Sequence, residues 1–573
     1  MTAKKMKKPK DISIVLCGQA GQGIQTVERL LTRILKIAGY NVYATKEYMS
    51  RVRGGMNSTE IRLSNKPVRA YVEKIDILVP LDKGAIPHLG KRISPKTVII
   101  GGKETLGDDI PAENTFFDVP FAKIGEEIAD KVYSNTVAVG VLTGLLGLKL
   151  EIASSYLKQF FSGKGDEIIE NNVKALTKGR QIGAELAKSG KVDFEIAPVS
   201  GLDKQLLING AEAVGLGSIA GGCNFVSSYP MSPSTGVLVF LAQHADDFGI
   251  IAEQAEDEIA AINMALGAWY AGARAMVTTS GGGFALMTEG VSLAGIIESP
   301  IVIHLAQRPG PATGLPTRTE QGDLELVLYA GHGEFPRIIF APGTIEEAFS
   351  LAQKAFNLAD KFQVPVFILT DQYFMDSYYN VEQLDLSNVK VEKHFVETSE
   401  KYKRYELTET GLSPRGIPGF GKGIVCVDSD EHDENGRITE DLDLRVKMVD
   451  KRLGKLELIQ AEAIEPELIG SKKYKNLIIC WGTTYHIVAE AVENLGRSDT
   501  AVLHFSQVYP LHPSTAGLLD KADKTIVVEI NATAQFARLL KIHANFDVDH
   551  KILKYNGLNF GADELAEKLK HVL

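Results

Sequence analysis

Cysteine is scarce in this chain, and the few cysteines are far apart. The 573 residues include four of them, Cys17, Cys223, Cys426 and Cys480, with no Cys-x-x-Cys spacing. Metal and iron–sulfur sites usually draw at least two ligands from one tight turn. We therefore expect no metal or cluster bound by this chain alone, and small buried thiols in a reducing compartment instead.

The chain also lacks an uninterrupted apolar run of the roughly 18 residues that a membrane helix needs. The closest segment is 137–150, whose glycines favour a buried helix. The lysine-rich start between Lys4 and Lys10 has no apolar segment of the kind that a secretory signal requires, and it predicts a solvated tail. We expect a cytoplasmic protein without membrane contact.

Positive charge is likewise in deficit. Lysines and arginines number 62 against 72 aspartates and glutamates, which gives a formal net charge of -10. This balance argues against nucleic acid as the main partner. The hydrophobic share of 45% and the charged share of 23% are ordinary for a soluble globular protein. At this length we expect roughly three or four domains.

The first motif is a glycine-rich turn between a strand and a helix. An apolar strand over 11–17 leads into Gly18-Gln19-Ala20-Gly21-Gln22-Gly23, and a helical pattern starts at Ile24. Free backbone N–H groups at a helix N-terminus bind anions, so this turn is a candidate anion site. Tight packing of strand against helix explains the glycines equally well. The Gly-x-x-Gly-x-Gly spacing does not meet the dinucleotide fingerprint, which disfavours a nucleotide-binding dehydrogenase.

The rest of the N-terminal part predicts an α/β domain over residues 1–190. Two arginines, Arg51 and Arg53, lie beside paired glycines, and strands and helices are expected to alternate from there to about residue 190. Residues 191–204 lack periodicity and predict a linker.

Three further parts follow. Residues 205–380 predict a second α/β domain, residues 381–465 a polar connecting arm, and residues 466–573 a third α/β domain. Within the arm, the acidic segment 428–434 favours an exposed turn over a metal site. The strands expected in the two α/β domains are 274–278, 301–305, 364–369, 476–480, 501–505 and 525–528.

The segment 228–287 is the most informative part of the chain. Its motifs are Ser228-Tyr229-Pro230-Met231-Ser232-Pro233, Glu256-Asp257-Glu258 and Thr278-Thr279-Ser280-Gly281-Gly282-Gly283. Nearly every residue between the last two motifs is small or apolar, so Glu258 stands at the head of an otherwise buried helix. A carboxylate kept out of water can hold or exchange a proton near neutrality, which is typical of a catalytic group.

More motifs follow in order: Gln307-Arg308-Pro309-Gly310-Pro311, Gly314-Leu315-Pro316-Thr317, Gln321-Gly322-Asp323 and Gly331-His332-Gly333-Glu334. Together with the Tyr-Pro motif, they resemble the pyrimidine-binding domain of the 2-oxoacid:ferredoxin oxidoreductases. These are thiamin diphosphate enzymes that make acyl-CoA from 2-oxoacids. The glycine turn and the Arg-Gly-Gly element look like the gamma domain of this family, and the last domain looks like its transketolase C-terminal-type domain.

The resemblance implies an α/β multidomain chain in which a gamma and an alpha subunit are fused. The reaction it implies is CoA-dependent oxidative decarboxylation of a 2-oxoacid to acyl-CoA, CO2 and reduced ferredoxin. The fused arrangement favours 2-oxoglutarate as the substrate, with pyruvate or a branched-chain 2-oxoacid as alternatives. A non-catalytic assembly subunit with the same fold is the alternative outside enzymes.

The resemblance also implies roles for particular residues. Glu258, or alternatively Glu256, matches the carboxyl that hydrogen-bonds the aminopyrimidine of thiamin diphosphate and assists removal of the proton from its reactive carbon. Both acids could instead only stabilise a helix N-terminus. Tyr229 and Pro230 belong to the same cofactor-binding motif.

Two further residues match substrate-binding positions. Ser232 matches a threonine that donates a hydrogen bond near the 2-oxo group, although it could instead cap the next helix. Arg308 matches the arginine that binds the substrate carboxylate, a task suited to a planar guanidinium, and a surface ion pair is its alternative. Arg318 is a weaker candidate for substrate or partner contact. In the gamma domain, Gly21, Gly23, Arg51 and Arg53 are the residues expected to contact coenzyme A.

Two parts of a complete enzyme are missing from the sequence. A Gly-Asp-Gly diphosphate–metal motif does not occur, and the cysteines supply no cluster. The family places Mg2+ and a [4Fe-4S] cluster on a beta subunit, which implies that thiamin diphosphate is shared with such a partner. We expect an (alpha-beta)2 heterotetramer that reduces ferredoxin.

Overall fold

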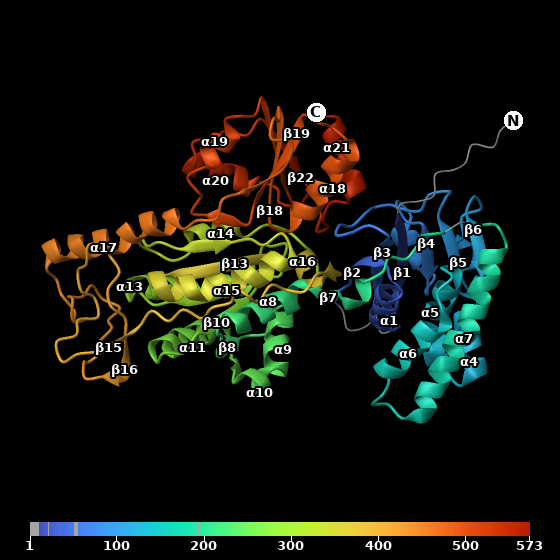
Figure 1. Ribbon diagram of the computed structural model, residues 1–573, viewed down its shortest axis with the longest axis horizontal. Coiled ribbons are helices and arrows are strands. Elements are labelled where there is room, and N and C mark those ends of the chain that lie inside the picture. The colour runs from blue at the N-terminus through green and yellow to red at the C-terminus, as the bar shows by residue number, and fades with distance from the viewer. Residues whose placement is uncertain (1–10, 21, 51–54, 193) are drawn as a thin grey trace. The chain divides into compact units, whose positions relative to one another are not determined.

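The computed structural model describes residues 11–20, 22–50, 55–192 and 194–573. These residues form two compact units (Figure 1). Unit 1 comprises the residues up to Ile208 with the segments Ser377–Gln383 and Gly561–Glu564. Unit 2 comprises Asn209–Asp376, Leu384–Phe560 and Leu565–Leu573.

Unit 1 is built on a mixed sheet whose described strands have the order β6-β5-β4-β1-β3-β2-β14-β7. β1, β4, β5 and β6 are parallel neighbours, whereas β3 is antiparallel to β1 and β2. The strand predicted over 11–17 is confirmed as β1. The strand bounds are β1 Asp11–Gln19, β2 Asn41–Glu47, β3 Met56–Ser64, β4 Ile77–Pro80, β5 Val98–Gly101, β6 Thr115–Asp118, β7 Leu206–Asn209 and β14 Tyr378–Val381.

The helices of unit 1 do not alternate with strands throughout. The expectation of alternation to about residue 190 is wrong beyond β6, because α4 to α7 follow one another without an intervening strand in the described chain. The helix predicted to start at Ile24 is confirmed as α1. The bounds are α1 Ile24–Ile37, α2 Ala85–Leu89, α3 Lys103–Leu106, α4 Phe121–Ile128, α5 Ser134–Leu145, α6 Leu150–Phe160 and α7 Asp166–Lys188.

Glycines allow α5 and α7 to pack backbone against backbone. A Cβ on Gly140 would lie 2.4 Å from the carbonyl oxygen of Leu176, and a Cβ on Gly183 would lie 2.0 Å from that of Val141. This close approach explains the apolar, glycine-containing run 137–150, which contributes to a buried helix as predicted. Among the described residues, no helix has both the length and the apolar character needed to cross a membrane.

The larger sheet of unit 2 has the order β20-β12-β13-β11-β10-β8-β9. Neighbouring strands are parallel except at the edge, where β20 pairs antiparallel with β12. The strands predicted over 274–278, 301–305 and 364–369 are confirmed as β10, β11 and β13. The bounds are β8 Phe225–Ser228, β9 Ile251–Gln254, β10 Ala275–Thr279, β11 Ile301–Gln307, β12 Ile338–Phe340, β13 Pro365–Asp371 and β20 Gln507–Tyr509.

A second sheet lies in the C-terminal part of unit 2, with the order β17-β19-β18-β21-β22. The strands predicted over 476–480, 501–505 and 525–528 are confirmed as β18, β19 and β21. The bounds are β17 Glu467–Gly470, β18 Asn476–Trp481, β19 Thr500–Phe505, β21 Lys524–Glu529 and β22 His550–Leu553. The chain is thus a multidomain α/β protein, as predicted.

Two helices of unit 2 begin at a capping box. Asn209 with Glu212 caps α8, and Thr344 with Glu347 caps α15, each as a reciprocal capping box. The helix bounds, including the last helix of the chain, are α8 Gly210–Ala220, α9 Thr235–Gln243, α10 Ala245–Phe248, α11 Glu258–Tyr270, α12 Gly281–Leu286, α13 Thr288–Ile296, α14 Leu324–Tyr329, α15 Ile345–Phe362, α16 Gln372–Asp376, α17 Leu442–Ala461, α18 Tyr485–Leu495, α19 Thr515–Leu519, α20 Gln535–His543 and α21 Ala562–Lys570.

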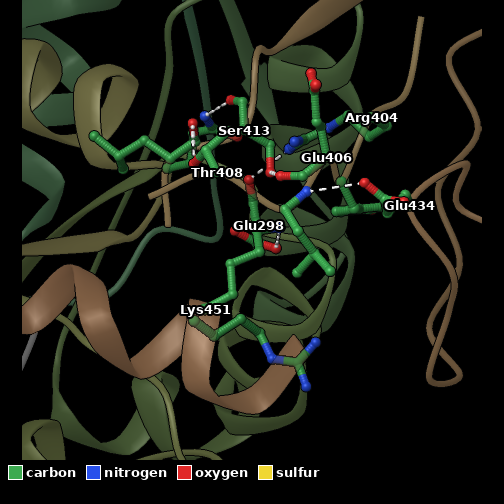
Figure 2. Close-up of polar contacts among 12 residues, drawn as sticks. Glu298, Arg404, Glu406, Thr408, Ser413, Glu434 and Lys451 are labelled. Atoms are coloured by element: carbon green, nitrogen blue, oxygen red, sulfur yellow. Dashed lines mark hydrogen bonds and ion pairs between the residues drawn. The ribbon is translucent and has the colours of Figure 1, made fainter. Parts of the chain in front are cut away.

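The arm between the two sheets contains the strand pair β15 (Val396–Thr398) and β16 (Gly416–Gly421) and the long helix α17. It is fixed to the core by buried charges. Lys451 Nζ donates to Glu298 Oε1 at 2.6 Å, and Arg404 donates to the Glu298 carbonyl oxygen at 2.8 Å (Figure 2). Lys455 forms an ion pair with the same Glu298 carboxylate. Glu298 follows α13, so these contacts tie the arm to the neighbouring α/β core.

The segment 428–434 only partly matches the expected exposed turn. Asp430 is exposed, but His432 is fully buried and its ring lies 3.8 Å from that of Tyr405. The prediction is wrong for His432, because the apolar body of an imidazole can pack in the core while its charged neighbours face water.

Candidate active site

The predicted site residues of unit 2 follow the carboxyl ends of adjacent parallel strands. The Tyr-Pro motif follows β8, Glu258 follows β9, the triple glycine follows β10, and Arg308 follows β11. β9 lies on one side of β8 and β10 on the other, so the strand order reverses at β8. In open α/β sheets, ligands bind at such a reversal, outside the carboxyl ends of the strands.

Glu258 is the first residue of α11 and is 3% exposed. Asp257 caps this helix, since its Oδ1 accepts a hydrogen bond from the Ala260 N–H at 2.7 Å. Glu258 is therefore not needed as the cap, and its Oε1 is buried without a hydrogen-bond partner. Glu256, the alternative candidate, is exposed. A buried carboxyl oxygen without a partner is costly and is typical of an atom reserved for a ligand.

Arg308 contacts the Tyr-Pro motif. Its Nη1 donates to the carbonyl oxygen of Ser232 at 2.7 Å, and its Nε is buried without a hydrogen-bond partner. Burial lowers the pKa of the Arg308 guanidinium, against the opposing charges of Asp323 and Glu258. The structure thus brings Arg308, Ser232 and Glu258 together. The side chain of Ser232 is exposed, and α9 is preceded by Ser234 instead.

Asp323 is a site residue that the sequence reasoning missed. Burial and then the charge of Glu320 raise the pKa of Asp323 to about 7, while Arg308 opposes the rise. Its Oδ2 is buried without a hydrogen-bond partner. The sequence does contain a signal for Asp323, because this residue ends the Gln-Gly-Asp motif. That motif supports the resemblance to the family but by itself assigns no role to Asp323.

Two of the three glycines after β10 make room for these carboxylates. A Cβ on Gly281 would lie 2.4 Å from the carboxylate oxygens of Asp323, and a Cβ on Gly283 would lie 2.4 Å from Glu258 Oε1. Ser280, just before them, has a buried hydroxyl without a hydrogen-bond partner. The triple glycine therefore lets two acidic groups approach the backbone closely.

The remaining candidates are placed as follows. Tyr229 is 40% exposed, and Pro230 is half-buried beside it. Gly23 precedes α1 with a left-handed backbone (φ 76°), and a Cβ there would lie 2.3 Å from Asn135 Nδ2. Gly21, Arg51 and Arg53 lie outside the described residues.

Family models match most of the chain. Residues 13–182 match the model described as pyruvate ferredoxin/flavodoxin oxidoreductase, and residues 216–451 match the thiamine diphosphate-binding model of pyruvate flavodoxin/ferredoxin oxidoreductase. The second match contains Glu258, Arg308 and Asp323.

Individual relatives match over nearly the full length. The 2-oxoacid:ferredoxin oxidoreductase subunit alpha of a Sulfolobus species is 33% identical, over 98% of this chain and 97% of its own. The 2-oxoglutarate oxidoreductase subunit KorA of Mycobacterium tuberculosis is 27% identical, over 98% of this chain and 92% of its own. A solved 2-oxoglutarate:ferredoxin oxidoreductase from Magnetococcus marinus, with 2-oxoglutarate, coenzyme A and succinyl-CoA bound, is similar with a TM-score of 0.91. It is 29% identical and covers 98% of this chain and 100% of its own.

The fold and these matches define an α/β protein with a thiamine diphosphate-binding domain. The chain belongs to the 2-oxoacid:ferredoxin oxidoreductases and corresponds to their alpha subunit, one chain of a multi-subunit enzyme. The family and enzyme class predicted from the motifs are thereby confirmed.

Proposed function

We propose that this alpha subunit acts on 2-oxoglutarate, converting it with CoA and oxidised ferredoxin to succinyl-CoA, CO2 and reduced ferredoxin. The observation that carries the proposal is the buried, unpartnered Oε1 of Glu258 beside Arg308 at the strand reversal. The choice of 2-oxoglutarate is supported by the names of the relatives at 27% and 29% identity. Pyruvate and branched-chain 2-oxoacids are the alternatives.

The residues present fit thiamin diphosphate. The unpartnered Oε1 of Glu258, which Gly283 allows to approach the backbone closely, is what an aminopyrimidine ring nitrogen would require. Bound thiamin diphosphate supplies a nucleophilic carbon for the 2-oxo group and an electron sink once CO2 leaves. In this proposal Glu258 would share a proton with the ring nitrogen, and Tyr229 and Pro230 would help to hold the cofactor.

Arg308 and Ser232 are proposed to bind the oxoacid. The unpartnered Nε of Arg308 gives the guanidinium a free donor for a substrate carboxylate, and its Nη1 is held by the Ser232 carbonyl oxygen. The exposed Ser232 hydroxyl is free to donate toward the 2-oxo group. Asp323 lies near enough to Arg308 for their charges to interact.

Coenzyme A is proposed to contact the N-terminal glycine turn. Gly23 opens α1, and Gly21, Arg51 and Arg53 are the other residues assigned to its phosphates. We also propose a beta subunit that supplies Mg2+ and a [4Fe-4S] cluster, in a cytoplasmic (alpha-beta)2 heterotetramer. This part of the proposal rests on the sequence, which contains neither a Gly-Asp-Gly motif nor closely spaced cysteines.

The test compares Glu258→Gln with Glu256→Gln in the complex co-purified with its partner subunit. Gln keeps the shape of the side chain but cannot share a carboxyl proton, so Glu258→Gln is expected to lower oxoacid-dependent reduction of a one-electron acceptor by at least about a hundredfold. Glu256→Gln, which changes an exposed acid two residues away, should stay near wild type. Near-normal activity of Glu258→Gln would remove it from the catalytic site.

The substrate is tested by the ratio kcat/KM over a panel of 2-oxoacids with CoA. We expect 2-oxoglutarate to give the highest kcat/KM. A higher value for pyruvate or a branched-chain acid would reassign the substrate, and inactivity with every acid would favour the non-catalytic alternative.

A further inference from the structure

His504 is a buried histidine whose ring has no polar partner. It lies on β19, is 1% exposed, and neither ring nitrogen has a hydrogen-bond partner. Burial favours the neutral form of the ring, in which one nitrogen carries a free lone pair. Buried polar side chains are nearly always hydrogen-bonded, so this orphaned ring indicates a ligand.

Two carboxylates converge on this ring. Glu467 on β17 is the register partner of His504 on β19, so both side chains leave the sheet on the same face. Glu347 reaches the ring from the first turn of α15. Its Oε2 accepts from the N–H groups of Gly343 and Thr344, while its Oε1 lies 3.6 Å from His504 Nδ1. One ligand atom of each of the three residues lies within 4.8 Å of the others.

The contact between His504 and Glu347 is neither a hydrogen bond nor an ion pair. A separation of 3.6 Å is too long for a hydrogen bond, and a neutral imidazole forms no ion pair. It is close to the edge of a tetrahedron around a zinc ion, which is about 3.3 Å for bonds of about 2.0–2.1 Å. The distance therefore suits two atoms that share a metal.

We propose that His504, Glu347 and Glu467 bind a divalent zinc-type cation, with water as the fourth ligand. An imidazole with two carboxylates suits Zn2+ better than Mg2+ or Ca2+, which take oxygen ligands. Glu467 is exposed and provides the entry path. The ion would fasten α15 to the C-terminal sheet, and none of its ligands belongs to the proposed active site.

Cys480 borders the proposed site without joining its ligands. It is the register partner of His504 on β18. Its Sγ does not belong to the group of ligand atoms that lie within 4.8 Å of one another, so only nitrogen and oxygen are expected around the ion.

The experiment measures zinc binding to the full chain in its co-purified complex. The complex is stripped with a chelator and dialysed against Zn2+, and zinc per alpha chain is counted by elemental mass spectrometry. Glu347→Gln and Glu467→Gln are the test variants. A Gln at position 347 still completes the capping box, and Glu467 is exposed, so both should fold. Glu465→Gln, an exposed acid two residues from Glu467, is the matched control.

After dialysis, wild type and Glu465→Gln are each expected to bind one zinc ion per alpha chain at the proposed site. Both test variants are expected to bind this ion at least about tenfold more weakly. X-ray absorption at the zinc edge, which is silent to iron, should show nitrogen and oxygen neighbours at about 2.0–2.1 Å. Equal zinc binding by wild type and the double variant Glu347→Gln/Glu467→Gln would overturn the proposal. Because oxoacid turnover is not the readout, this result is independent of the proposed function.

Discussion

Asp323 and Glu258 flank one arginine, and each leaves a carboxyl oxygen without a partner. Asp323 has a pKa raised to about 7, mainly by burial, so its charge changes close to neutrality. When it ionises, it competes with an oxoacid for Arg308.

This competition predicts a pH-dependent KM. Asp323 is mostly neutral at about pH 6 and mostly ionised at about pH 8, so the KM for the oxoacid should rise about tenfold across this range. In Asp323→Asn the side chain at position 323 is neutral over this whole pH range, so the KM for the oxoacid should stay nearly constant. The KM is measured by steady-state kinetics over this pH range in wild type and in Asp323→Asn. An equally steep rise of KM in Asp323→Asn would exclude Asp323 as the cause.

The second prediction at this scale concerns Arg308. Arg308→Lys keeps a positive charge but loses the planar donor pair, so KM is expected to rise by about tenfold to a hundredfold, since charged hydrogen bonds contribute about 1.5–3 kcal/mol. Arg318→Lys is the control, because Arg318 is the weaker substrate candidate. Similar KM values for Arg308→Lys and wild type would place the substrate carboxylate elsewhere.

At the scale of elements, the first turn of α12, which follows β10, offers a matched pair of glycines. Gly283→Ala places a methyl group 2.4 Å from Glu258 Oε1 and 2.3 Å from Thr279 Oγ1, whereas the nearest atom to a methyl group on Gly282 is 3.5 Å away. Displacing a catalytic group by about 1 Å can lower the rate about a hundredfold. Gly283→Ala should therefore lose activity while Gly282→Ala keeps it, both with a wild-type circular dichroism spectrum. Equal activities would contradict a role for this close approach.

Elements with strong local signals could be predicted from the sequence, whereas those fixed by distant contacts could not. Apolar runs such as 301–305 and 364–369 identified β11 and β13, because strands buried on both faces are hydrophobic throughout. The succession α4 to α7 was missed, since helix pairing through Gly140 and Gly183 is a tertiary effect. The order of motifs predicted Glu258, Ser232 and Arg308 as candidate site residues, but Asp323 required knowing that its loop folds over Gly281.

At the scale of the whole molecule, buried charge holds the arm in place. Glu298→Gln leaves Lys451 and Lys455 without their common anion, and removal of one partner of a buried pair typically costs about 3–5 kcal/mol. We expect a clearly lower midpoint in urea unfolding. Glu434→Gln breaks the partly exposed pair with Lys403 at 3.0 Å and should change the midpoint little. Equal midpoints for the two variants would show that the buried cluster does not stabilise the chain.

The strand β14 lies between β2 and β7 in the sheet of unit 1. In the sequence, however, the strands β8 to β13 of unit 2 come between β7 and β14. β14 can take its place beside β2 only after the ribosome has added the 170 residues from Ile208 to Tyr378 (378 − 208). At bacterial and eukaryotic elongation speeds this takes roughly ten to thirty seconds. Throughout that interval the nascent N-terminal sheet presents β2 as an unpaired edge, so the period of synthesis is when this protein is most exposed to mispairing with another chain.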